Sequence, residues 1–190
     1  MMKFTRLLSP AAALMAFASA AHAEESVDLK VGDAAPTFEA KTDTGEAWSS
    51  KDFADKVLVV YFYPAAMTGG CTKQACAYRD DRDSLAAKGV EVVGVSGDLV
   101  PALALFKQAE GLNFTLLSDP DGAVAKKFGV PTGKGGKIER EVDGKTHTLE
   151  RGVTSKRWTF VIKDGKIVYK NSQVNAAGDS KAILAFLEKQ

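Results

Sequence analysis

The sequence contains few of the side chains that bind metals or act as catalytic bases. Its 190 residues include only two cysteines and two histidines, and His147 is the one histidine beyond the first 23 positions. Two thiols and one distant imidazole make a poor zinc site. A hydrolytic triad would depend on His147 as its base, in a segment without any flanking signature. These shortages disfavour zinc-binding and hydrolytic functions.

An excess of charge of one sign is also missing. The chain has 25 basic and 24 acidic residues, so its formal net charge is +1, and removal of Lys3 and Arg6 would make it about −1. So small a net charge produces no strong field to recruit nucleic acid or an anionic membrane. The sequence has no internal repeats and no low-complexity segment, and its length suits one domain with a sizeable core.

The first 23 residues have the features of a cleaved signal peptide. Lys3 and Arg6 give a basic start, residues 7–20 are mostly apolar, and residues 21–23 form a small-x-small cleavage site. The apolar run is too short to span a bilayer comfortably, which disfavours a membrane anchor. We therefore expect a mature domain of residues 24–190 in a bacterial periplasm, without stable membrane association after cleavage.

The most informative stretch is residues 59–76. Residues 59–63 are β-branched or aromatic, which favours a buried central strand. Pro64 ends that strand because proline cannot donate to a β-ladder. A Gly-Gly pair then permits a tight turn, and helix-forming residues follow Cys71. The pattern predicts a strand, a short loop and a helix that begins at Cys71.

Cys71 would therefore lie at a helix N-terminus. The free N–H groups and partial positive charge at such an end stabilise an anion, and a thiolate is an anion. A cysteine in this place is more reactive than an ordinary thiol. The alternative is a small buried cysteine that behaves as an inert apolar residue. The strand–loop–helix context favours the reactive thiol.

The spacing Pro64-x-x-x-Thr68-x-x-Cys71 resembles the active-site signature of the peroxiredoxins. The wider run of residues 62–80 resembles the bacterioferritin-comigratory-protein (peroxiredoxin Q) branch, although that branch often has a proline before the glycine-cysteine pair where this chain has a second glycine. The similarity extends from about Val31 to the C-terminus. It implies an α/β, thioredoxin-like fold of the peroxiredoxin type, with a central mixed sheet flanked by helices and an N-terminal β-hairpin.

The same resemblance implies a thiol-dependent peroxidase. The Cys71 thiolate would attack hydrogen peroxide or an organic hydroperoxide and become a sulfenic acid, and Cys76 would condense with it to form a Cys71–Cys76 disulfide. A thioredoxin-like reductant protein would then reduce the bridge by thiol–disulfide exchange. This chemistry requires no metal, haem or flavin cofactor.

Other site residues also take their roles from the resemblance. Thr68 would hydrogen-bond the thiolate and the peroxide, Arg157 would stabilise the thiolate and hold the peroxide, and Pro64 would shield the thiolate from water. The backbone N–H groups of Gly70 and Cys71 would point at the same place. The simpler alternatives are a loop-capping Thr68, a solvated surface Arg157 and a strand-terminating Pro64.

The two cysteines are spaced C-x4-C rather than C-x-x-C. In an ideal helix their Cα atoms would lie roughly 8–9 Å apart, whereas disulfides rarely span more than about 7 Å. Either the helix starts after Cys71, or its first turns unwind before the bridge forms. A permanent disulfide in an oxidising compartment is the alternative.

Two other functions remain open on the residues alone. A thioredoxin-like thiol–disulfide oxidoreductase would share the fold and the compartment, but Gln74 occupies the second cysteine position of its C-x-x-C motif. A non-enzymatic redox-sensing or metal-binding module could use the C-x4-C pair. The resemblance implies a monomer, and a weak dimer would also be compatible with it.

The remaining residues predict alternating strands and helices. Residues 132–156 are a glycine- and charge-rich insertion, for which we expect an exposed hairpin around Asp143-Gly144, with a mobile loop as the alternative. Asp179 or Ser180 is expected to cap the last helix. The other expected strands are 38–42, 46–48, 57–63, 90–96, 113–118, 159–162 and 167–169, and the other expected helices are a short one ending at Phe53 and those at 101–110 and 123–128.

Overall fold

The computed structural model describes residues 27–190. The predicted signal peptide, residues 1–23, and the expected mature start at Glu24 lie outside the described residues. In chain order the elements are β1 (Glu39–Thr42), β2 (Ala47–Ser49), η1 (Ser50–Phe53), β3 (Val57–Phe62), α1 (Gly69–Asp80), α2 (Arg82–Ala86), β4 (Val90–Ser96), α3 (Val100–Glu110), β5 (Thr115–Ser118), α4 (Ala123–Lys127), β6 (Thr132–Val142), β7 (Lys145–Ser155), β8 (Trp158–Lys163), β9 (Lys166–Asn171), η2 (Ala176–Gly178) and α5 (Asp179–Leu187).

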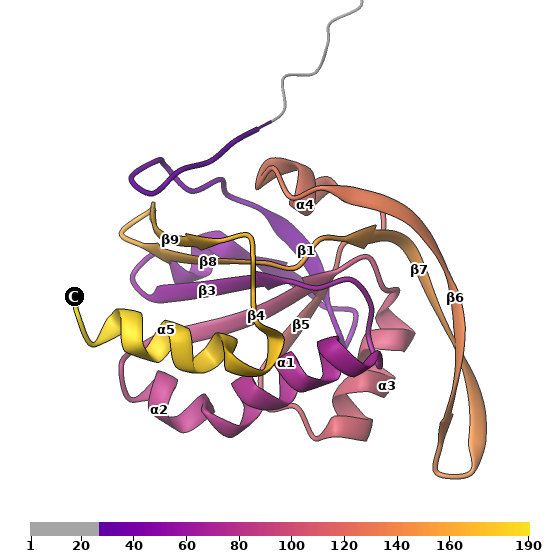
Figure 1. The fold of residues 1–190 in the computed structure, drawn as a ribbon. Helices are drawn as coiled ribbons and strands as arrows, with labels where there is room; N and C mark the ends of the chain where they lie inside the picture. Colours follow the sequence, from indigo (N-terminus) through magenta and orange to yellow (C-terminus); the bar gives the residue numbers. More distant parts are fainter. Residues whose placement is uncertain (1–26) are drawn as a thin grey trace, which may run out of the picture.

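Seven of these strands form one sheet in the order β2-β1-β5-β4-β3-β8-β9 (Figure 1). Strands β3, β4 and β5 run parallel, whereas β1 pairs antiparallel with β5 and β8 pairs antiparallel with β3. Helices α1, α2, α3 and α5 cover one face of the sheet, and α4 lies on the other. The predicted mixed sheet flanked by helices is thus confirmed, as is the N-terminal hairpin of β1 and β2.

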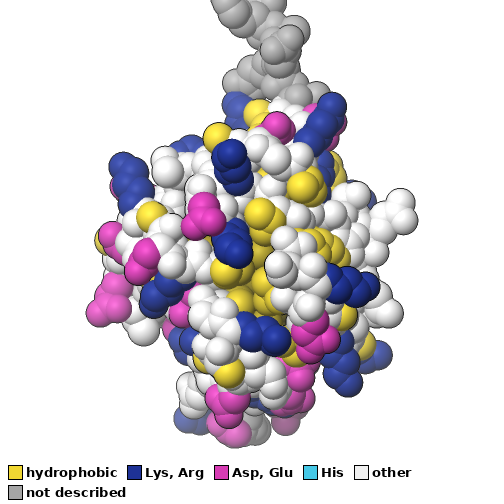
Figure 2. Space-filling view, turned by 90° about the vertical axis from the view of Figure 1, so that its left-hand side faces the viewer, with side chains coloured by type: hydrophobic (Ala, Val, Ile, Leu, Met, Phe, Trp, Pro, Cys, Tyr) yellow, Lys and Arg dark blue, Asp and Glu magenta, His cyan; other side chains and the backbone are white. Residues whose placement is uncertain are grey.

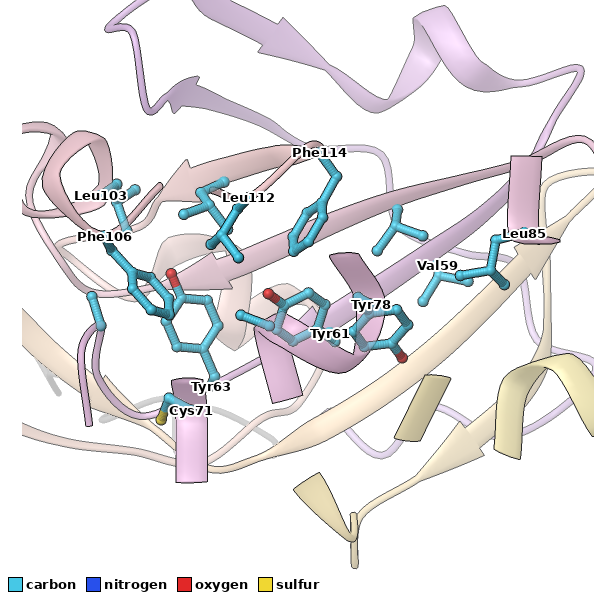
Figure 3. Packing of buried hydrophobic residues seen from close by; sticks show 14 of the residues in the cluster. Val59, Tyr61, Tyr63, Cys71, Tyr78, Leu85, Leu103, Phe106, Leu112 and Phe114 are labelled. Atoms are coloured by element: carbon cyan, nitrogen blue, oxygen red, sulfur yellow. The ribbon is translucent and has the colours of Figure 1, made fainter. Parts of the chain in front are cut away.

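Strand β3 lies inside the sheet, between β4 and β8, and both of its faces are apolar. Successive side chains of a strand point to opposite faces. Tyr61 and Tyr63 pack with the helices α1 and α3, and Phe62 packs with residues of α4 and β8 on the other face. Figure 3 shows Tyr61, Tyr63 and Cys71 in one buried cluster, with Cys71 next to Tyr63. Cys71, the candidate for the reactive cysteine, therefore packs on α1 against a buried strand of the sheet.

Most of the predicted element boundaries are confirmed within one or two residues. The short helix η1 has Ser49 as its N-cap, whose hydroxyl accepts from the Lys51 N–H at 3.4 Å. Helix α3 ends at Gly111, which takes a φ of 59° in the left-handed region that glycine adopts readily.

The start of α5 differs from the prediction. Gly178 is the N-cap, and neither Asp179 nor Ser180 caps the helix. Asp179 is 2% exposed and accepts hydrogen bonds from α1 and β8, and Ser180 donates to Asp81 Oδ2 at 2.7 Å. Both side chains face inward, so they attach α5 to the rest of the domain instead of capping it.

Residues 132–155 form a long antiparallel hairpin, β6 and β7, rather than a loop. The hairpin curves away from the large sheet and passes beside α3 (Figure 1). Its turn residues Asp143 and Gly144 have φ values of 51° and 73°, as a tight two-residue hairpin turn requires. Leu149 is fully buried in the core, and Gly152 N–H donates to Gly97 O at 3.0 Å. The hairpin is therefore anchored on the domain along β7.

The surface seen in Figure 2 mixes Lys and Arg side chains with Asp and Glu side chains around a small apolar area. This face therefore carries no extended patch of one sign, in keeping with the nearly balanced composition. Among residues 27–190, no helix has the length and apolar character needed to cross a membrane.

Candidate active site

The C-terminal end of β3 leads directly into the candidate active site. The loop that follows β3 is held beside β4, because Tyr63 N–H donates to Val95 O at 3.1 Å. Helix α1 then begins at Gly69. In open α/β sheets, ligand sites lie outside the carboxyl ends of the parallel strands, which is where this loop is placed.

Cys71 lies in the first turn of α1 and is 2% exposed. The helix begins two residues earlier than predicted. Its first backbone hydrogen bond runs from Thr72 N–H to Thr68 O at 2.8 Å, so the N–H groups of Gly70 and Cys71 precede the helix's own ladder. The sulfur of Cys71 therefore lies at the positive end of the α1 dipole.

Arg157 is brought to Cys71 by the pairing of β3 with β8. Phe62 is paired with Trp158, so the residue before Trp158 lies beside the loop that follows Phe62. Arg157 Nη2 lies 3.1 Å from Cys71 Sγ, a hydrogen-bond contact between residues 86 positions apart in sequence. A guanidinium at this distance stabilises negative charge on the sulfur. The alternative of a solvated surface arginine is therefore wrong.

Gly70 leaves room for that guanidinium. A Cβ at position 70 would lie 3.3 Å from Arg157 Nη2, tighter than ordinary van der Waals contact. Any other side chain here would push against the group that contacts Cys71. Gly70 thus has a spatial reason that Gly69 does not share, since a Cβ at Gly69 would have no neighbour within 4 Å. Neither glycine has a positive φ, because both belong to α1 and not to the expected tight turn.

Thr68 and Pro64 occupy the loop between β3 and α1. Thr68 is the N-cap residue of α1, and its hydroxyl donates to Ala65 O at 2.9 Å. The hydroxyl therefore closes the loop, as the simpler alternative predicted, and among residues 27–190 it makes no hydrogen bond to Cys71, in contrast to the expected contact with the thiolate. Its oxygen lone pairs can still accept a hydrogen bond from a substrate. Pro64 lies two residues after the end of β3 and is half-buried.

Gln74 is a site residue that sequence reasoning did not identify. Its side chain is fully buried on α1, and its Oε1 accepts a hydrogen bond from Arg157 Nη1. Its Nε2 donates to Asp179 Oδ2 at 2.7 Å. Gln74 thus joins the guanidinium at the site to a buried carboxylate on α5. Its one available signal was a polar residue one turn after Cys71 on the same helix.

The loop before α1 is held by two further residues that the sequence did not reveal. Asp98 is fully buried, and its Oδ2 accepts from Ala66 N–H at 2.7 Å while its Oδ1 forms an ion pair with Arg151 at 3.1 Å. Arg140 of β6 donates through Nε to Met67 O at 2.9 Å. The hairpin therefore touches the backbone of the active-site loop, and Met67 has a positive φ of 55° there.

Cys76 has a different environment from Cys71. It is half-buried in the middle of α1, and its Sγ lies 3.7 Å from Glu110 Oε2 at the end of α3. Burial raises the pKa of the Cys76 thiol, the charge of Arg79 lowers it, and Glu110 raises it further. Arg79 forms an ion pair with Asp80 at 2.8 Å, and Arg79 Nη1 also donates to Glu110 O at 2.6 Å.

Both cysteines are free thiols, and α1 runs without a break through both of them. This geometry corresponds to the intact-helix case, in which a bridge between them needs unwinding of the first turns. Among residues 27–190 there is no group of three or more His, Cys, Asp or Glu side chains arranged to hold a metal ion. The chemistry that the site offers is that of a buried thiol beside a guanidinium, with a second thiol further along the same helix.

The fold and the site together define a thiol peroxidase built on a thioredoxin-like domain. The AhpC/TSA family model matches residues 31–170. Escherichia coli peroxiredoxin Bcp is 40% identical over 162 residues, which cover 85% of this chain and 97% of the relative.

The solved structure of peroxidoxin BcpB from Mycobacterium tuberculosis has a TM-score of 0.70 and 36% identity, and the match covers 85% of this chain and 98% of that one. The bacterioferritin comigratory protein of Xanthomonas campestris has a TM-score of 0.66 and 27% identity, over 80% and 90% of the two chains. The chain therefore belongs to the AhpC/TSA family, in its Bcp/peroxiredoxin Q branch of thiol peroxidases. Membership implies a hydroperoxide substrate and a thioredoxin-like reductant.

Proposed function

We propose that Cys71 is the peroxidatic cysteine and Cys76 the resolving cysteine of this peroxidase. The Cys71 thiolate attacks one oxygen of a hydroperoxide, the O–O bond breaks, and the other oxygen leaves with a proton as water or an alcohol. The oxidised sulfur is a sulfenic acid. The Cys76 thiol then displaces its hydroxyl, which leaves as water, and the Cys71–Cys76 disulfide forms.

The observation that carries this assignment is the 3.1 Å contact between Arg157 Nη2 and Cys71 Sγ. The guanidinium stabilises the attacking thiolate and is within reach of a peroxide oxygen bound against the sulfur, where negative charge develops as the O–O bond breaks. The N–H groups of Gly70 and Cys71, and the Thr68 oxygen, supply further hydrogen-bonding groups to the same volume. By the family resemblance, Pro64, which is half-buried in the same loop, would shield the sulfur from water.

The environment of Cys76 supports its role as the second thiol. A carboxylate beside it disfavours its thiolate, and the thiolate is the form that peroxide oxidises. Cys76 therefore stays reduced until the Cys71 sulfenic acid forms. A thioredoxin-like protein recycles the disulfide by thiol–disulfide exchange, and Gln74, at the C-x-x-C position, leaves the chain without the motif of such a reductase.

The site is proposed to work in an exported compartment, as a monomer or weak dimer. The support for export is the signal-like sequence of residues 1–23, with Lys3 and Arg6 before an apolar run. The N-terminal residue of the protein recovered from a periplasmic fraction tests this proposal. A chain that keeps Met1, or that fractionates with the cytoplasm, would contradict it.

Intact mass spectrometry after one equivalent of hydrogen peroxide tests the roles of the two thiols. The reduced wild type is expected to lose two hydrogens, Cys76→Ser to gain one oxygen, and Cys71→Ser to stay unmodified. Cys76→Ser has a single cysteine and cannot form an intramolecular disulfide. A loss of two hydrogens in this variant would therefore reveal another reaction.

The same experiment separates the alternatives. If Cys71 does not react with peroxide over minutes while the protein exchanges disulfides with a dithiol, the thiol–disulfide oxidoreductase replaces the peroxidase. If it is Cys76 that acquires oxygen in the Cys71→Ser variant, the two roles are reversed.

A further inference from the structure

A buried carboxylate lies behind the active site, separated from Cys71 by two side chains. Asp179 Oδ2 accepts hydrogen bonds from Gln74 Nε2 at 2.7 Å, Tyr78 Oη at 2.8 Å and Thr159 Oγ1 at 2.7 Å. Its other oxygen, Oδ1, is buried and has no hydrogen-bond partner among residues 27–190. Burying a carboxylate with one oxygen unpaired is unfavourable. The three hydrogen bonds that Asp179 accepts therefore point to a specific role for this residue.

The hydrogen-bonding character of Arg157 and Asp179 permits only one orientation of the Gln74 amide. A guanidinium has donors only, so the atom that faces Arg157 must be the carbonyl oxygen. An ionised carboxylate has acceptors only, so the atom that faces Asp179 must be the NH₂ group. The structure has this orientation, with Oε1 toward Arg157 and Nε2 toward Asp179.

We propose that Asp179 is a positioning residue for peroxide reduction, which directs the Gln74 carbonyl at Arg157 and so holds the guanidinium against Cys71. The inference rests on the proposed function, in which Arg157 serves the Cys71 thiolate. Asp179, the first residue of α5, would affect the reactivity of Cys71 through Gln74 and Arg157 and would not itself touch the thiol or the peroxide.

Burial leaves this chain of side chains without solvent partners, and the hydrogen-bond donors counter the effect of burial on the charge of Asp179. Gln74 is fully buried and Asp179 is 2% exposed, so water is not at hand to replace a lost partner. Burial also raises the pKa of Asp179, while the hydrogen bonds from Thr159, Gln74 and Tyr78 lower it. The three donors therefore favour the ionised, acceptor-only form on which the orientation of Gln74 depends.

The test is the Asp179→Asn variant in the Cys76→Ser background. Asparagine keeps the size of the side chain but removes its charge. An amide oxygen in the place of Oδ2 holds Gln74 Nε2 more weakly than a carboxylate does, and an NH₂ group in that place lets the Gln74 amide turn its own NH₂ group toward Arg157. We expect the rate constant for Cys71 with hydrogen peroxide to fall about tenfold, the order expected for loss of one hydrogen bond to a charged group. The ultraviolet titration of the Cys71 thiolate should shift to higher pH.

The matched control is Ser180→Ala, on the neighbouring residue of the same helix. It removes the hydrogen bond from Ser180 to Asp81, so it weakens the attachment of α5 without touching Gln74. Its peroxide rate constant and its thiolate titration should both match those of the parent protein. If Ser180→Ala slows Cys71 as much as Asp179→Asn does, the effect is a general loosening of α5 and the proposal fails.

A second substitution provides a rescue that a structural role would not give. In Asp179→Asn/Gln74→Glu the polarity of the pair is reversed, since the new carboxylate at 74 accepts from both Arg157 and the new amide at 179. We expect this double variant to react faster with peroxide than Asp179→Asn alone. If Asp179→Asn does not fold, Asp179→Ser, whose small hydroxyl can still accept from Tyr78, is expected to show the same loss of rate.

The titration of the Cys71 thiolate needs no peroxide, so failure of the proposal is distinguishable from failure of the proposed function. An unchanged thiolate titration and an unchanged rate in Asp179→Asn would overturn the role of Asp179 while the peroxidase stands. A wild-type protein whose Cys71 ignores peroxide, but whose titration shifts in Asp179→Asn, would overturn the peroxidase and keep the positioning.

Discussion

Two regions of one helix give the same chemical group opposite surroundings. At the start of α1, Cys71 is buried with a guanidinium 3.1 Å from its sulfur. Five residues later, Cys76 is half-buried with a carboxylate oxygen 3.7 Å from its sulfur. The first thiol has a cation and a helix N-terminus beside it, and the second has an anion and the middle of the helix.

This difference shows how one helix can keep two thiols in separate roles. In the proposed reaction, the cation and the helix dipole promote the thiolate of Cys71, which reacts first. Burial and the Glu110 carboxylate raise the pKa of the Cys76 thiol against the opposing charge of Arg79, and so disfavour the thiolate that reacts second. On this proposal, the order of the two steps follows from burial and local electrostatics. Removing the charge of Arg157 or of Glu110 should therefore reduce the difference in reactivity between Cys71 and Cys76. Substitutions of residues that hold these two charged groups in place should have smaller effects of the same kind.

The largest effect is expected from the cation. Arg157→Ala removes the guanidinium from Cys71, and we expect the rate constant for peroxide to fall about 10²–10³-fold, as for loss of a preorganised transition-state donor. The rate constant of Arg157→Lys should lie between those of the parent protein and Arg157→Ala. An ammonium keeps the charge but cannot contact Cys71 and Gln74 at once as the planar guanidinium does. Stopped-flow kinetics of the Cys76→Ser background measures this rate. Equal rates in wild type and Arg157→Ala would mean that the contact has no part in the reaction.

A smaller effect of opposite sign is expected at the other thiol. Glu110→Gln removes the negative charge beside Cys76, which lowers the pKa of that thiol toward its usual value. More thiolate is then present at neutral pH, so disulfide formation after oxidation of Cys71 should be faster by roughly two- to fivefold. The gain should shrink as the pH is raised, because the wild-type thiol is then ionised too.

Rapid acid quench followed by mass spectrometry separates the sulfenic acid from the disulfide and measures that step. Glu110→Asp, which keeps the charge, is the control and should stay close to wild type. Neither substitution affects the hydrogen bond from Arg79 Nη1 to the Glu110 backbone carbonyl oxygen. A slower bridge in Glu110→Gln would show that the carboxylate takes the thiol proton instead of merely repelling the thiolate.

The parts of the site that could be predicted from the sequence are those determined by residues close together in the chain. Strand β3, the loop and α1 follow from a run of β-branched and aromatic residues, a proline and a glycine pair, and Arg157 was found by resemblance to a motif. Gln74, by contrast, meets Arg157 and Asp179 across 83 and 105 residues, and such pairings exist only after the sheet and helices have packed.

Asp179 shows why the local rule failed there. An aspartate at the start of an amphipathic helix predicts an N-cap, because its carboxylate can accept from the first free N–H groups. The tertiary structure offers it three donors from α1 and β8 instead, and the side chain turns inward to them. Glu110 and Arg140 were missed for the same reason, since nothing near them in sequence marks their partners on α1 and in the loop before it.

The smallest effect is expected from the hairpin, and it should reach only one of the two thiols. Arg140 donates to Met67 O in the loop before Cys71, at 2.9 Å, and within residues 27–190 it makes no hydrogen bond to the Cys76 end of α1. Arg140→Ala should therefore lower the peroxide rate constant of Cys71 by a few-fold, in line with loss of about 1 kcal/mol from one hydrogen bond. The alkylation rate of Cys76 in the Cys71→Ser background should not change. Lys137→Ala, which breaks only the exposed ion pair with Glu150 on the same hairpin, is the control and should alter neither thiol. If Arg140→Ala changes the reaction rates of Cys71 and Cys76 equally, the hairpin supports α1 as a whole. The different surroundings of the two thiols would then not include the contact between the hairpin and the loop before Cys71.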